Sequence, residues 1–76
     1  MITKLKNGAS AIGCFEVEKD KWIVLAIYKN DFVVWHVDID GNAYWGRYFT
    51  KFYTALNCFT LLVRETIVSN CKEKVL

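Results

Sequence analysis

The 76-residue sequence predicts an α+β fold: an antiparallel β-meander of three to four strands, followed by one C-terminal α-helix packed on one sheet face. Two observations predict it. Up to Phe49, short apolar blocks are separated by polar turn residues, which is typical of strands. After Thr50, apolar residues recur every three or four positions, which is typical of an amphipathic helix. A chain of this length forms a single small domain, residues 1–76.

The first two predicted strands precede Lys29. Residues 1–10 offer little to bury, so we expect a loose N-terminal arm or a short leading strand. Between residues 14 and 18, Phe15 and Val17 face one side while two glutamates face the other, a pattern of period two that indicates a half-buried strand. Residues 22–28 form an uninterrupted apolar run, which predicts a central strand covered on both faces.

Residues 32–49 are predicted to form a β-hairpin that turns at Asp40-Gly41. Asp-Gly between alternating runs is a strong hairpin signal, because a type I′ turn needs positive φ at both central positions. A three-residue loop with a bulge would shift the register by one residue, so that alternative stays open. With a two-residue loop the predicted pairs are Ile39–Asn42, Val37–Tyr44, Trp35–Gly46 and Val33–Tyr48. The opposite face would then carry Phe32, Val34, His36, Trp45, Arg47 and Phe49.

The last segment is predicted to be a helix that begins at a Thr50 cap and ends near Asn70, with a frayed tail over residues 71–76. Its apolar stripe has to be buried, and one sheet face is the large apolar surface available. The other face still carries aromatic and aliphatic side chains. We therefore expect a second copy or another protein to cover that face. The stripe comprises Phe52, Leu56, Phe59, Val63 and Ile67.

Composition argues against several classes of protein. The net charge is only +2 and the basic residues are scattered, which disfavours a polybasic tail for nucleic acid or membranes. Three cysteines without a C-x-x-C motif fit neither a disulfide framework nor a zinc site, and free thiols indicate a reducing cytoplasm. The N-terminus lacks the apolar core of a signal peptide, and no run is long enough to span a membrane.

No motif in the sequence predicts a catalytic site or a metal-binding site. Asp38, Asp40 and Asn42 resemble the start of a calcium loop, but the glycine falls at the fourth position and Phe49 occupies the twelfth, where a bidentate Glu is required. His36 is the single histidine, and no spacing brings it to Cys58. We therefore expect no catalytic residue, no metal and no cofactor, and hence a protein that is not an enzyme.

The residues Val33-Val34-Trp35, Asp38-x-Asp40-Gly41-Asn42 and Tyr44-Trp45-Gly46-Arg47-Tyr48-Phe49, followed by a helix, resemble a set of small hypothetical proteins. These proteins are encoded by phages and mobile elements of low-GC Gram-positive bacteria. The similarity covers about residues 21–65. Arg47 stands where that pattern commonly has His, so no role of that His transfers to this chain.

The resemblance implies a small non-enzymatic protein that binds and modulates a host protein in the host cytoplasm, for example as an anti-defence inhibitor. The apolar second face of the sheet adds the expectation of a homodimer. Aromatic residues and Arg dominate binding energy at interfaces. One alternative is a single-stranded nucleic-acid-binding module that stacks bases on the same rings. Another is a sponge for a small nucleotide signal, and either tryptophan could simply be a core anchor. The expected partner-binding residues are Trp35, Tyr44, Trp45, Arg47 and Tyr48.

Overall fold

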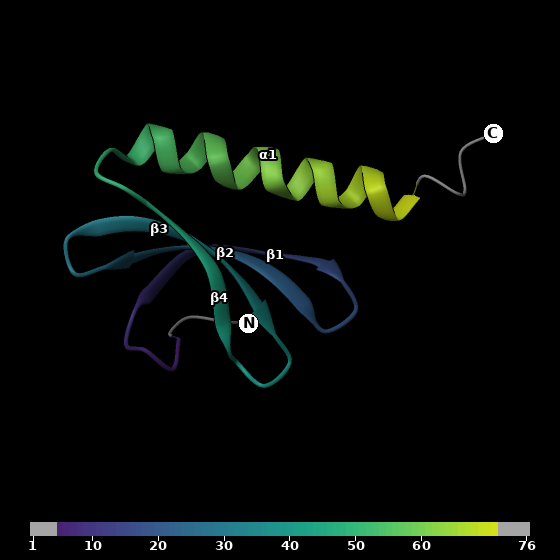
Figure 1. Cartoon of the computed structure of the whole chain (residues 1–76), viewed down its shortest axis with the longest axis horizontal. Coiled ribbons are helices and arrows are strands. Elements are labelled where there is room, and N and C mark those ends of the chain that lie inside the picture. Colours follow the sequence, from purple (N-terminus) through teal and green to yellow (C-terminus); the bar gives the residue numbers. More distant parts are fainter. Residues whose placement is uncertain (1–4, 72–76) are drawn as a thin grey trace.

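The structure is a computed structural model that describes residues 5–71. Its elements are β1 (Ser10–Glu18), β2 (Lys21–Tyr28), β3 (Asp31–Asp38), β4 (Ala43–Phe49) and α1 (Phe52–Cys71). The strands form one antiparallel sheet in the order β1-β2-β3-β4, and α1 lies across one of its faces (Figure 1). The predicted four-stranded meander with a C-terminal helix is therefore confirmed.

The first two hairpins turn tightly. Tyr28 pairs with Asp31, so the β2–β3 loop has two residues, Lys29 and Asn30, with φ values of 49° and 71°. Positive φ at both central positions is the geometry of a type I′ turn. The turn type expected at Asp40-Gly41 thus occurs at the preceding hairpin.

The β3–β4 hairpin differs from its prediction at the loop. Residues 39–42 form the loop, and Asp38 N–H donates to the Asn42 carbonyl at 3.2 Å. The Asp38 carboxylate explains the longer loop, because its Oδ1 accepts from the backbone N–H of Asp40 and of Asn42, each at 3.0 Å. Gly41 has positive φ, whereas Asp40 does not.

The longer loop changes the register near the turn. His36 pairs with Tyr44 and Val37 with Ala43, so the predicted pairs Val37–Tyr44 and Ile39–Asn42 are wrong. The register here is shifted by one residue, as the alternative with a longer loop predicted. The predicted pair of Val33 with Tyr48 is confirmed, because a β-bulge between Val34 and His36 absorbs the shift. In this bulge Trp45 and Gly46 together lie opposite Trp35.

Helix α1 begins and ends one or two residues away from its predicted limits. The Lys51 carbonyl accepts the first helical bond, from Ala55 N–H at 3.2 Å, so Lys51 rather than Thr50 is the N-cap residue. The helix continues through Asn70 to Cys71, since Asn is a weak stop signal. The rest of the predicted tail, residues 72–76, lies outside the described residues.

One core lies between α1 and the sheet. The helix begins over the start of β3 and the end of β4, where the Phe52 ring contacts Phe32 at 5.5 Å between centroids. Its C-terminal half lies beside Phe15 of β1. Ala55 is completely buried, and its small side chain lets the helix approach the strands closely. The predicted helix stripe therefore faces the sheet as expected. The buried residues of this cluster are Ile23, Leu25, Val34 and Ala55.

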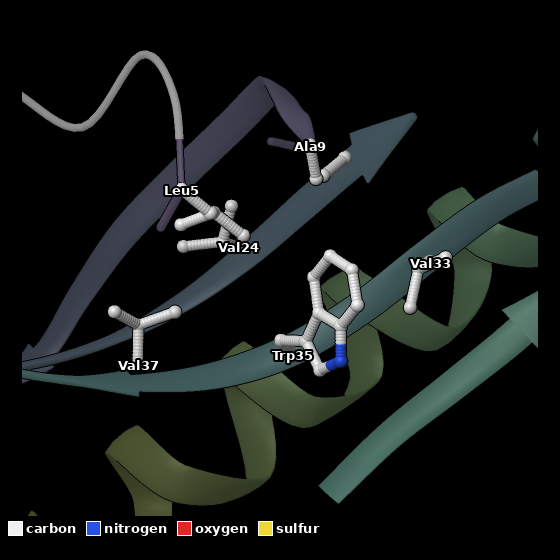
Figure 2. Close-up of a cluster of buried hydrophobic side chains, with 7 residues drawn as sticks. Leu5, Ala9, Val24, Val33, Trp35 and Val37 are labelled. Carbon is white, nitrogen blue, oxygen red and sulfur yellow. The ribbon is translucent and has the colours of Figure 1, made fainter. Parts of the chain in front are cut away.

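A second core lies on the opposite face of the sheet. Val24, Val33 and Trp35 are buried there by the chain itself (Figure 2). Leu5 and Ala9, which precede β1, cover this face. These core residues are therefore buried without a partner, and the expectation that a second copy or another protein covers the rest of this face stays a prediction.

The expected loose arm is wrong for the described residues 5–10. Leu5 N–H donates to the Ala9 carbonyl at 3.0 Å, and Gly8 N–H donates to the Leu5 carbonyl at 2.9 Å. The Asn7 side chain accepts from Ala9 N–H at 3.0 Å, and Ser10 already belongs to β1. These bonds fold the segment into a compact turn, which lets Leu5 reach the sheet. Residues 1–4 lie outside the described residues.

Candidate binding site

The bulge in β4 gathers three rings on one face of the sheet. Consecutive strand residues normally point to opposite faces, but Trp45 has a φ of 56°, which turns its side chain to the face that Tyr44 occupies. His36 stacks on Tyr44 with centroids 5.8 Å apart, and Trp45 meets both rings edge-on, at 5.1 Å from His36 and 4.9 Å from Tyr44. We call these three residues and Arg47 the aromatic corner.

The path of α1 leaves this corner open. The corner shares the face that α1 covers, because His36 and Arg47 alternate with the core residues of the other face. The helix contacts this face from Phe32 toward β1, so it passes away from the loop end of the β3–β4 hairpin. As a result the Trp45 side chain is 72% exposed.

The charges of the corner are one neutral imidazole and one cation. Partial burial, and secondly the positive charge of Arg47, hold the pKa of His36 below its ordinary value of 6.5. The imidazole is therefore neutral at pH 7. Within residues 5–71 the only ion pair joins Lys21 to Glu18 at 3.7 Å, so the Arg47 guanidinium is not neutralised by a described carboxylate.

A groove between β4 and α1 continues from the corner. Arg47 forms one wall with Phe49, and the helix forms the other. The groove is mixed in polarity, since amide, hydroxyl, thiol and carboxylate groups share it with leucines. Its helix residues are Thr54, Asn57, Cys58, Leu61, Leu62 and Glu65.

The five expected partner-binding residues do not form one site. Tyr44, Trp45 and Arg47 share the aromatic corner, whereas Trp35 and Tyr48 lie on the opposite face. Trp35 is 4% exposed and lies edge-on to Tyr28 and Tyr48, with centroid distances of 5.6 and 6.1 Å. Its assignment to partner binding is therefore corrected: it is a core residue.

Sequence reasoning missed His36 as a member of the site. The hairpin pattern already placed His36, Trp45 and Arg47 on one face, and that signal could have found it. The same pattern placed Tyr44 on the Trp35 face, because it assumed that side chains alternate strictly along β4. A bulge breaks that alternation. At the bulge the Trp35 indole lies over Gly46, a tertiary contact that strand periodicity does not describe.

Asp38, the last residue of β3, stabilises the hairpin turn with its carboxylate. The pKa of Asp38 is lowered, chiefly because its carboxylate accepts the Asn42 backbone N–H. In the part of the chain that the structure describes, no group of three or more His, Cys, Asp or Glu side chains is placed to hold a metal ion. No helix in that same part is long and apolar enough to cross a membrane.

Comparison of the chain with protein-family models, curated proteins and solved structures finds no match. Its function has to be inferred from the chemistry of the aromatic corner.

Proposed function

We propose that this chain is a non-enzymatic protein that binds and modulates another protein through its aromatic corner. The main support is Trp45, which combines a left-handed backbone with an exposed side chain. A left-handed backbone costs a residue with a side chain roughly 1–2 kcal/mol, and glycine would fill this bulge position without that cost. The indole is 72% exposed, so burial in the fold offsets little of the cost. Strained residues that the fold does not need are typical of functional sites.

The corner has the composition of an interface hot spot. Trp, Tyr and Arg are the residues that most often dominate binding energy at protein interfaces. The edge-on contacts of Trp45 with His36 and Tyr44 orient its ring before a partner arrives, which lowers the entropy lost on binding. Arg47 supplies a cation that a partner carboxylate can neutralise.

The resemblance to small phage and mobile-element proteins supports a host protein as the partner. We propose that the chain acts in the cytoplasm of the host cell and inhibits a host enzyme or defence complex. This step rests on the kind of protein that the chain resembles, whereas the binding surface rests on the aromatic corner.

The test compares three forms of the chain as affinity baits in host lysate. Wild type and Tyr53→Ala should capture the same protein, because Tyr53 is equally exposed, at 77%, but lies on α1 away from the corner. Trp45→Gly should weaken binding of the captured protein by at least about tenfold, since a hot-spot Trp contributes 2 kcal/mol or more. Capture unchanged by Trp45→Gly, with denaturation curves showing a folded variant, would overturn the proposal.

One observation favours a second function, binding of single-stranded nucleic acid. An exposed indole beside an unneutralised guanidinium can stack a base and contact its phosphate. Fluorescence anisotropy with labelled oligonucleotides at low salt tests it. Binding that falls steeply with salt and disappears in both Trp45→Gly and Arg47→Gln would replace the protein-binding proposal.

A further inference from the structure

An apolar groove lies at the opposite edge of the sheet from the aromatic corner, between β1 and the C-terminal half of α1. Its volume is about 380 Å³. Two of its apolar side chains are largely open to solvent, Phe15 at 45% and Val68 at 61%. An exposed apolar groove of this kind marks an interaction surface. The lining residues are Phe15, Phe59, Thr60, Val63, Arg64, Ile67 and Val68.

The edge of the sheet beside this groove is not shaped to receive another strand. Irregularities interrupt β1 between Ala11 and Gly13 and again between Glu16 and Glu18, which leaves a regular segment of only a few residues. Bulges of this kind protect edge strands from pairing with a new strand. The other way in which proteins protect an edge is to cover it with a helix.

We propose that the groove is a homodimer interface in which α1 of each copy covers β1 of the other. A two-fold axis that runs between the sheet layer and the helix layer produces this arrangement. Such an axis makes contacts reciprocal, so Phe15 of each copy enters the groove of the other. The exposed Val68 then meets an apolar ring instead of water.

Charge complementarity supports a second copy as the occupant. Arg64 lies at the rim of the groove, and Glu16 follows Phe15 directly. Glu16 points away from the α1 face of its own sheet, so the two-fold arrangement brings it alongside Arg64 of the second copy. In residues 5–71 neither side chain forms an ion pair, since the only one is Lys21 with Glu18. Glu65, the acidic neighbour of Arg64, lines a hollow with Arg64 and Val68 as well as the groove toward β4, and among the described residues it forms no ion pair with Arg64.

Sedimentation of the full chain across the micromolar range tests the proposal. Wild type should be a dimer, and Val68→Glu should shift it to monomer, because two carboxylates would enter an apolar contact. Val68 is exposed on a helix, so the variant keeps its fold, which circular dichroism checks. Ile39→Glu is the matched control: Ile39 is an exposed apolar residue at the β3–β4 loop, and its variant should remain dimeric.

A charge swap tests the pairing itself. Arg64→Glu and Glu16→Arg should each weaken the dimer by about tenfold or more, because each leaves like charges facing at both symmetric contacts, and the double variant should restore it. A monomeric wild type, or a dimer that Val68→Glu leaves intact, would overturn the interface. A double variant no stronger than the single ones would overturn the Arg64–Glu16 contact. Trp45→Gly should leave the dimer unchanged, so this outcome is independent of the proposed function.

Discussion

At the scale of single residues, Trp35, Trp45 and Gly46 act as one unit. The indole of Trp35 lies over Gly46, where no side chain obstructs it, and the bulge that accommodates the extra residue gives Trp45 its left-handed backbone. The contact of Trp35 with Gly46 could be predicted from the hairpin pattern. The exposure of Trp45 could not, because it goes with the bulge and the positive φ, which strict alternation does not anticipate.

Replacing Gly46 with Ala should destabilise the fold by roughly 1–3 kcal/mol, the usual cost of overpacking. A Cβ at this position would lie 2.9 Å from Cδ1 of Trp35, and that ring is held by the core and cannot move freely. Urea denaturation measures the change in the free energy of unfolding. Gly13→Ala is the control, since its Cβ would meet Leu25 Cβ at 3.6 Å, an ordinary contact, and should change stability little. Equal stability of both variants would contradict the packing of Trp35 on Gly46.

His36 should make stability depend on pH. Because burial and Arg47 lower the pKa of His36 in the folded state, the unfolded chain binds this proton more tightly. The free energy of unfolding contributed by His36 is therefore constant above about pH 6.5, falls as the pH drops below the unfolded pKa, and levels off below the folded pKa.

Nuclear magnetic resonance can follow the single imidazole through its titration. The pKa should lie below 6.5 in wild type. Arg47→Gln should raise it only part of the way, because burial is the larger cause. A wild-type pKa at or above 6.5 would contradict the arrangement of the aromatic corner.

At the scale of elements, the sequence predicted those strands and the helix that depend on the periodicity of apolar side chains. The alternation in β1, the apolar block of β2 and the stripe of α1 each follow from side-chain periodicity, and each element is found. The β3–β4 loop was predicted two residues too short, because the Asp38 carboxylate replaces strand pairing with its own bonds to Asp40 and Asn42. Because the loop is longer than predicted, the strand pairs next to it were also predicted wrongly.

The docking of α1 on the sheet should depend on Phe59. Its ring belongs to the core between helix and sheet and lies over Gly13. Phe59→Ala should cost about 3 kcal/mol, the low end for removal of a core Phe because this ring is only half-buried. Leu61→Ala, at an exposed position of the same helix, should cost far less. Comparable losses in chemical denaturation would mean that the helix presents a different face to the sheet.

At the scale of the whole molecule, one short chain buries both faces of its sheet. The helix covers one face, and the segment before β1 covers part of the other (Figure 1). The polar composition of residues 1–10 concealed this role, since Leu5 is a lone large apolar residue within the turn. Because the helix was counted as the one element that covers the sheet, a partner was expected on the Trp35 face. The surfaces that we propose for partners are the aromatic corner and the groove beside β1, which lie at opposite edges of the sheet.

The segment before β1 should therefore be necessary for stability rather than dispensable. Leu5→Ala removes a buried side chain that packs in the cluster with Val24, Trp35 and Val37, so it should cost roughly 2–3 kcal/mol. Ser10→Ala, an exposed position at the start of β1, should change stability little. The free energy of unfolding is measured in urea, and iodide quenching of tryptophan fluorescence should rise in Leu5→Ala as the Trp35 face opens to solvent. A variant as stable as wild type would contradict the place of Leu5 in this core.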